Sequence, residues 1–140
     1  MSIKSCVIVA AIATSLARAG RRVVCFVGDG GIGMGLAELE TLARLDLPVT
    51  VVVFNDSTLT LIALKQRAEG HGGSAAVRYA DTSFAGIAAS MGVAAETVST
   101  AADYVRAVVH SARTPRPYLL DVRIDPAGYP QIMDSIRGAR

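Results

Sequence analysis

The chain has 140 residues, of which 51% are hydrophobic and 19% charged, so it is long enough to bury one sizeable core and too short for two. We therefore expect a single domain over residues 1–140. The formal net charge is only +2, and the basic residues are scattered rather than clustered with aromatic residues, which argues against a nucleic-acid partner. The two cysteines, Cys6 and Cys25, lie in apolar runs without metal-ligand spacing, which favours buried, reduced thiols.

The apolar run of residues 6–17 is shorter than the roughly 20 residues that a membrane span needs. The start of the chain matches a signal peptide only loosely, because a single Lys4 precedes the apolar segment. We therefore expect a cytoplasmic protein that does not bind membranes.

The first half of the chain predicts a helix followed by a strand, a second helix and a second strand. Residues 5–19 are rich in Ala, Leu and Ile and end at Gly20, a residue suited to the turn after a helix. Residues 23–27 and 49–54 are apolar, β-branched runs, typical of strands covered on both faces. Between them, residues 34–45 carry leucines at helical spacing, at Leu36, Leu39, Leu42 and Leu45. We expect the two strands to be parallel.

The second half repeats this alternation. Thr82 or Ser83 is expected to cap a helix that runs through residue 91, and Thr100 a helix that runs through residue 112. Residues 96–98 and 118–122 are predicted strands, residues 130–136 a final helix, and residues 65–78 the one long loop. Alternating strands and helices predict an α/β fold with three layers, in which a mostly parallel sheet carries helices on both faces.

A glycine-rich loop follows the first predicted strand. Gly28-Asp29-Gly30-Gly31-Ile32-Gly33 satisfies the GxGxxG pattern of dinucleotide-binding folds and precedes a predicted helix. In any phosphate-binding loop of this kind, glycines let the backbone approach the anion, and amides at a helix N-terminus point at it. The loop therefore predicts a phosphate ligand.

Asp29 narrows this prediction, because a carboxylate beside a diphosphate repels it unless a cation lies between them. Mg²⁺ prefers oxygen ligands, some from protein and the rest from phosphates and water. The second predicted strand ends in Asn55-Asp56, and the carboxyl ends of parallel strands are where ligands gather. Each motif alone is also typical of a tight turn or a helix cap. Together they favour a site for a metal and a diphosphate.

These motifs resemble the signature of thiamine-diphosphate-dependent enzymes. Gly28-Asp29-Gly30 is followed after 24 residues by Asn55-Asp56, where the usual form has Asn-Asn. Further likeness to the acetolactate synthase, pyruvate oxidase and decarboxylase branch lies in Val23 to Gly33, Glu38-Leu39-Glu40-Thr41, Leu47-Pro48 and Asp125-Pro126. The resemblance implies the C-terminal diphosphate-binding domain of such an enzyme, with thiamine diphosphate and Mg²⁺ as cofactors.

Carried over residue by residue, the resemblance implies that Asp29, Asp56 and the main-chain oxygen of Thr58 hold the metal. Asp56 replaces the usual neutral donor by an anionic one, which is a stronger ligand for Mg²⁺. Asn55 is implied to orient the loop. The other cofactor-binding residues implied are Gly28 in the loop, Gly30 and Gly31 through their amides, and Leu59 and Thr60 flanking the diphosphate.

The resemblance also implies a lyase or transferase that acts on a 2-oxo acid such as pyruvate. In this family the glutamate that activates the cofactor lies on a separate pyrimidine-binding domain, usually of a neighbouring subunit, and 140 residues cannot encode it. The first strand of the diphosphate domain normally lies upstream of the point where Met1 stands. We therefore expect an N-terminally truncated domain with no catalytic residue of its own, inactive alone, with an exposed apolar surface that favours homo-oligomers.

Three other interpretations stay open. A natural small subunit of a two-chain enzyme is the alternative to a fragment. A nicotinamide-binding dehydrogenase domain would use the GxGxxG match, with Asp56 on a ribose, although Asp29 would then repel the pyrophosphate. A non-catalytic module of the same fold, which assembles with a partner, is the third.

Overall fold

Four parallel strands form one sheet in the computed structural model, which describes residues 6–71 and 75–137. The strands are β1 (Val23–Gly28), β2 (Val49–Asn55), β3 (Ala94–Val98) and β4 (Tyr118–Arg123), in the order β1-β2-β4-β3. Val23 pairs with Val49, and Thr50 with Tyr118, so the carboxyl ends of β1, β2 and β4 lie at the same edge of the sheet. The four predicted strands and their parallel arrangement are confirmed.

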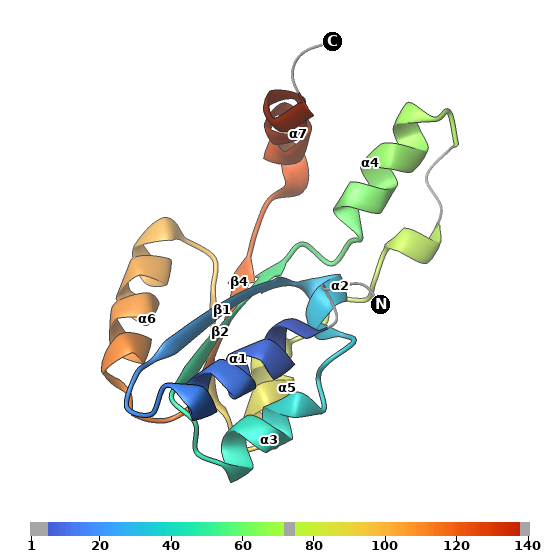
Figure 1. Cartoon of the computed structure of the whole chain (residues 1–140). Coiled ribbons are helices and arrows are strands. Elements are labelled where there is room, and N and C mark those ends of the chain that lie inside the picture. Colours follow the sequence, from blue (N-terminus) through green and yellow to red (C-terminus); the bar gives the residue numbers. More distant parts are fainter. Residues whose placement is uncertain (1–5, 72–74, 138–140) are drawn as a thin grey trace.

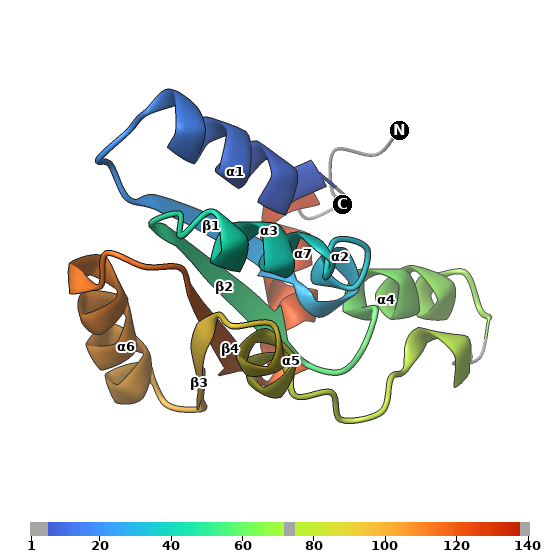
Figure 2. The ribbon, with the colours of Figure 1, turned by 90° about the horizontal axis from the view of Figure 1, so that it is seen from below.

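Helices cover both faces of this sheet, as predicted (Figures 1 and 2). The helices are α1 (Val7–Ala17), α2 (Asp29–Ile32), α3 (Glu38–Arg44), α4 (Thr60–Ala68), α5 (Phe84–Ser90), α6 (Ala101–Arg113) and α7 (Tyr129–Arg137), with 3₁₀ turns η2 (Ala75–Val77) and η3 (Pro126–Gly128). α1, α3 and α5 pack on one face through a fully buried set that includes Leu39, Leu42 and Val51. α6 packs on the other face against Val52 and Leu120. In the part of the chain that the structure describes, no helix has the length and apolarity to cross a membrane.

Local sequence signals account for several boundaries. Gly20, after α1, has a φ of 79°, the left-handed conformation that glycine adopts without strain. The hydroxyl of Ser83 accepts a hydrogen bond from the Gly86 amide at the start of α5, and that of Thr100 accepts one from the Asp103 amide at the start of α6. Both predicted caps are therefore confirmed, with Ser83 rather than Thr82 as the first.

Two predicted segments differ from the structure. The helix expected over residues 34–45 begins only at Glu38, because the glycine motif itself forms α2 and the chain then turns, with the Gly35 amide donating to the carbonyl of Ile32. Leu45, expected on the buried side, is 42% exposed. The loop expected over residues 65–78 begins later, since α4 continues to Ala68, supported by an i,i+4 ion pair between Lys65 and Glu69. Residues 72–74 of that loop, and Ser5 of the first predicted helix, lie outside the described residues.

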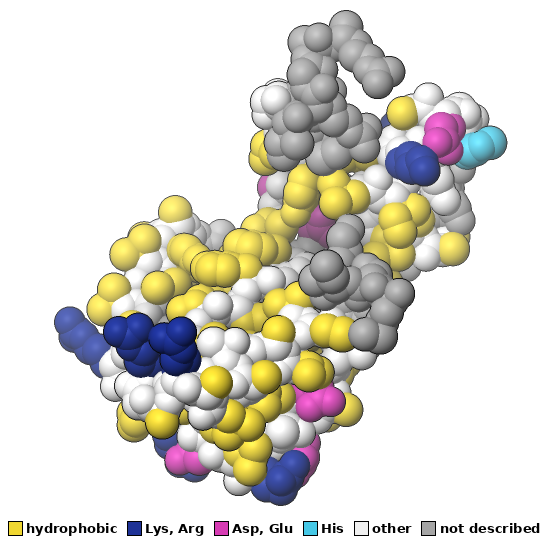
Figure 3. All heavy atoms as spheres, viewed as in Figure 1, with side chains coloured by type: hydrophobic (Ala, Val, Ile, Leu, Met, Phe, Trp, Pro, Cys, Tyr) yellow, Lys and Arg dark blue, Asp and Glu magenta, His cyan; other side chains and the backbone are white. Residues whose placement is uncertain are grey.

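β1 is covered on one face only, contrary to the expectation of a strand buried on both. Cys25 and Val27 are buried beneath α1, whereas Val24 is 49% and Phe26 55% exposed. The reason is that α6 reaches β2, β4 and β3 but not β1. Phe26 stacks on Phe54 of β2 with the ring centres 6.2 Å apart. Figure 3 shows hydrophobic side chains at the surface between α6 and α7.

Candidate functional site

The first half of the site is the loop at the carboxyl end of β1. Asp29 is the first residue of α2 and is only 7% exposed. Its Oδ1 accepts a hydrogen bond from the Gly30 amide at 2.7 Å. This amide, which the sequence predicts to bind a diphosphate, therefore already has a partner within the chain. Gly31 lies in the first turn of α2, where amides have no partner within the helix. The loop thus supplies one carboxylate and a backbone suited to an anion.

At Gly30, the ends of two neighbouring side chains occupy the space where a Cβ atom would lie. A Cβ at this position would lie 2.4 Å from Leu59 Cδ2 and 2.9 Å from the hydroxyl oxygen of Tyr79. Both distances are shorter than any normal contact, so a side chain here would displace its neighbours. The side chains of Leu59 and Tyr79 therefore approach the Gly30 backbone closely.

The second half of the site is the loop at the carboxyl end of β2. The Thr58 amide donates to Asp29 Oδ2 at 3.2 Å and to Asp56 Oδ1 at 2.9 Å. The structure therefore brings the two predicted acidic ligands together on one N–H group, although they are 27 positions apart in the sequence. Asp56 Oδ2 accepts from the hydroxyl of Thr60 at 2.5 Å, and Leu59 contributes the side chain that faces Gly30.

The two carboxylates repel each other at this edge of the sheet. Burial raises the pKa of Asp29 above its usual range, the negative charge of Asp56 raises it further, and hydrogen bonds from the amides of Gly30 and Thr58 act in the opposite direction. A divalent cation between the carboxylates would remove the repulsion and stabilise the charged form of both. The donor chemistry of the two carboxylates thus fits Mg²⁺.

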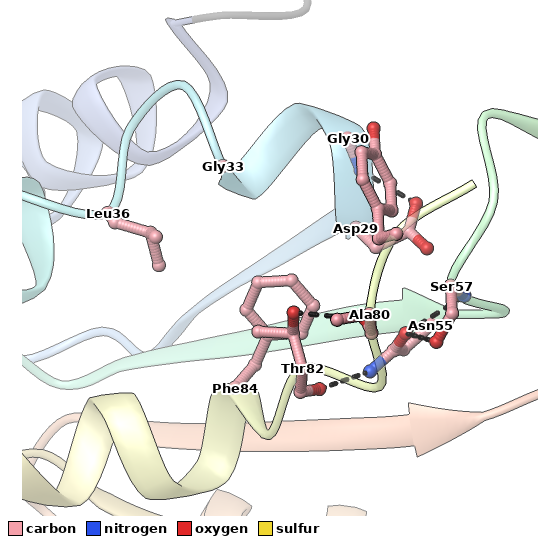
Figure 4. A pocket seen from close by; sticks show the side chains of 10 residues that line it. Asp29, Gly30, Gly33, Leu36, Asn55, Ser57, Ala80, Thr82 and Phe84 are labelled. Atoms are coloured by element: carbon pink, nitrogen blue, oxygen red, sulfur yellow. Dashed lines mark hydrogen bonds between the residues drawn. The ribbon is translucent and has the colours of Figure 1, made fainter. Parts of the chain in front are cut away.

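Asn55 lies at the end of β2, and its side chain forms hydrogen bonds with neighbouring segments. It is 2% exposed, and its side-chain amide donates to Asp121 Oδ1 at 2.9 Å and to the Thr82 carbonyl at 3.1 Å. Its Oδ1 accepts from the Ser57 amide at 3.2 Å. Figure 4 shows Asn55 reaching toward Thr82 and Ser57.

Sequence analysis assigned no role to three further residues at the site. Asp121 is a fully buried acid that interrupts the apolar run of residues 118–122, and that pattern was the available signal. Tyr79 and Tyr129 gave no local signal, because they lie far from the motif in sequence. Burial raises the pKa of both hydroxyls, and the charges of Asp29 and Asp56 raise it further, so both lie within the field of the acidic pair.

Two cavities meet at Asp29 and Gly30. One, of about 450 Å³, extends from the glycine loop and residues 56, 58 and 60 to apolar walls that include Phe26, Phe54 and Leu61. The other, of about 350 Å³, lies between Asn55, Leu36 and Phe84 (Figure 4). Within residues 6–71 and 75–137, no three His, Cys, Asp or Glu side chains gather as a metal site. A metal held by Asp29 and Asp56 would therefore complete its shell with main-chain, ligand or water oxygens.

Comparisons with known proteins identify the family of this chain. Residues 6–122 match the family model of the C-terminal TPP-binding domain of thiamine pyrophosphate enzymes. A probable acetolactate synthase large subunit of Methanococcus aeolicus is 30% identical over 118 residues, which is 84% of this chain and 20% of the relative. The large subunit of acetolactate synthase isozyme 1 of Escherichia coli K12 is 32% identical over 117 residues, 83% of this chain and 21% of the relative.

Among solved structures, the thiamine diphosphate-dependent 4-hydroxybenzoylformate decarboxylase of Rhodococcus jostii RHA1 superposes with a TM-score of 0.79 at 26% identity. The match covers 83% of this chain and 22% of the decarboxylase. The chain thus spans about a fifth of the length of the relatives that it matches.

Proposed function

Because the chain belongs to the thiamine pyrophosphate enzymes, as their C-terminal TPP-binding domain, we propose that it holds the cofactor's diphosphate through Mg²⁺ bound to Asp29, Asp56 and the Thr58 carbonyl. The observation that carries the proposal is the convergence of both carboxylates on the Thr58 amide, beside a glycine that leaves no room for a side chain. Gly28, Gly30 and Gly31 let the backbone approach the diphosphate. Leu59 and Thr60 flank it at the start of α4.

We further propose that the domain serves an enzyme that makes or cleaves a carbon–carbon bond of a 2-oxo acid, as a lyase or transferase. Thiamine diphosphate, when bound, supplies a nucleophilic ring carbon that also accepts an electron pair. The residues of this chain bind and orient the diphosphate end of the cofactor, and a pyrimidine-binding domain or subunit supplies the activating glutamate. The isolated chain is accordingly expected to show no turnover of 2-oxo acids.

Calorimetric titration of the purified chain tests the binding proposal. We expect thiamine diphosphate to bind in the presence of Mg²⁺ and not in the presence of EDTA, because the cation offsets repulsion between Asp29 and the diphosphate. Asp29→Ala should abolish this binding, since it removes the ligand from the first loop. Asp56→Asn should preserve it, because an amide oxygen still donates to the metal.

Equal loss in both variants would contradict the assignment of Asp56 as a ligand that an amide can replace. Binding of NAD without a metal would instead support a dinucleotide-binding domain. Activity recovered on mixing the chain with a pyrimidine-binding partner would indicate a true subunit, whereas a stable but inactive complex would indicate a non-catalytic module.

A further inference from the structure

A buried side-chain network lies behind the Asp56 loop. Asp121, in β4, has no exposed surface. Its Oδ2 accepts from the amides of Phe84 at 2.9 Å and Ala85 at 3.4 Å, at the start of α5, and lies 3.7 Å from Arg123 Nη2. Its Oδ1 accepts from Asn55 Nδ2 at 2.9 Å. A buried carboxylate is stable only when partners of this kind satisfy it, so these contacts fix its position.

The hydrogen bonds of this network fix the orientation of the Asn55 side-chain amide. Nδ2 donates both to Asp121 and to the Thr82 carbonyl, which are acceptors only. The oxygen of the same amide therefore faces the loop, where it accepts from the Ser57 amide. Ser57 has a φ of 57°, a left-handed conformation that residues other than glycine rarely adopt. The hydrogen bond from Ser57 to Asn55 thus stabilises an otherwise unfavourable turn.

This turn sets the position of the two ligands on the second loop. Asp56 precedes Ser57, and Thr58 follows it with its amide shared by both acidic side chains. We propose that Asp121 is a positioning residue of the magnesium site, which acts through Asn55 to hold the Ser57 turn and present Asp56 and the Thr58 carbonyl to the metal. The proposal rests on the proposed function. Partners that orient metal ligands typically change metal affinity by about 10- to 100-fold when mutated.

Asp121→Asn tests the proposal with little change of shape. The two α5 amides keep the remaining oxygen toward the helix, so the new NH₂ group faces the NH₂ group of Asn55. Asn55 can avoid this donor–donor contact only by rotating its amide group by about 180°. Its NH₂ group then faces the Ser57 N–H, which loses its acceptor. In the presence of thiamine diphosphate, we expect the variant chain to bind Mn²⁺ at least about 10-fold more weakly than the wild-type chain. Electron paramagnetic resonance of the free ion measures this affinity.

Leu119→Ala is the matched control, because Leu119 lies on the same face of β4, is fully buried and takes no part in the network. It should lower the free energy of unfolding while leaving Mn²⁺ affinity unchanged. Equal weakening by both variants would show that Asp121 acts only through overall stability, and wild-type affinity in Asp121→Asn would also overturn its role. Failure of the wild-type chain to bind Mn²⁺ together with thiamine diphosphate would instead overturn the proposed function itself.

Hydrogen exchange at the Ser57 amide gives a readout without metal. Asp121→Asn should accelerate this exchange, because Ser57 loses its acceptor. In the double variant Asn55→Asp/Asp121→Asn, a carboxylate at position 55 can accept both from the Ser57 amide and from the new amide at position 121. It cannot donate to the Thr82 carbonyl as Asn55 does, so protection should return only in part. Wild-type exchange at Ser57 in the single variant, or no recovery in the double variant, would contradict the proposal.

Discussion

At the scale of a single residue, a substitution at Gly30 should affect cofactor affinity more than the stability of the fold. Gly30→Ala places a Cβ against Leu59 Cδ2 and the Tyr79 hydroxyl, both at the ends of side chains that can move. We expect a loss of only about 1 kcal/mol in the free energy of unfolding, the low end of the cost of overpacking. Cofactor affinity should fall by more than this loss of stability, because we expect the displaced Leu59 side chain to enter the cavity proposed for the diphosphate. Urea denaturation and calorimetry measure the two effects.

Gly33→Ala provides the comparison, because a Cβ there would meet its nearest neighbour, the Asp29 carbonyl oxygen, at an ordinary 3.5 Å. It should leave both stability and affinity close to the wild type. If Gly30→Ala binds the cofactor as tightly as Gly33→Ala does, cofactor binding does not require a residue without a side chain at position 30.

The sequence predicted the placement of those site residues that lie next to a recognisable strand. The Asp29 and Asp56 motifs each follow an apolar strand directly, so parallel pairing was enough to predict that they meet. The burial of Asp121 and the approach of Tyr79 to Gly30 depend on how α5 and the segment after α4 fold back onto the sheet. No spacing rule contains that information, although a lone acid in an apolar strand is a recognisable anomaly.

At the scale of an element, α6 depends on its first turn. The Thr100 hydroxyl accepts from the Asp103 amide at 3.1 Å and donates to the Asp103 carboxylate at 2.8 Å, so it caps the first turn and is itself held by the Asp103 side chain. Thr100→Ala should lower the free energy of unfolding by about 1 kcal/mol, the usual worth of such a cap. Urea denaturation monitored by circular dichroism measures this change.

Ser99→Ala, one residue earlier and exposed, should change stability by less than about 0.5 kcal/mol, as typical surface substitutions do. An equal effect of the two variants would mean that the Thr100 hydrogen bonds add nothing to α6. Caps of this kind were predictable because they are local. The start of α3 was not, because the leucine spacing of residues 34–45 continues through turns that the preceding glycines impose.

At the scale of the whole molecule, β1 forms an edge of the sheet with one side uncovered. The Val23 amide donates to the Pro48 carbonyl on the β2 side, so in a parallel strand the backbone groups of Val24 and Phe26 point away from the sheet. Their side chains are also exposed. The apolar run of residues 23–27 predicted burial on both faces, and only the faces that α1, α5 and α6 reach are buried. Cover by other elements cannot be read from the strand itself.

An open strand edge with exposed aromatic side chains favours association. We expect the chain to form dimers or larger species as its concentration rises, and Phe26→Lys to shift it toward the monomer, because a charge on an edge strand opposes pairing. Sedimentation velocity measures the distribution. Leu16→Lys is the matched control: Leu16 is 59% exposed on α1, away from the Phe26–Phe54 stack, so its replacement should leave association unchanged. A chain that stays monomeric, or equal effects of both variants, would show that this edge does not drive assembly.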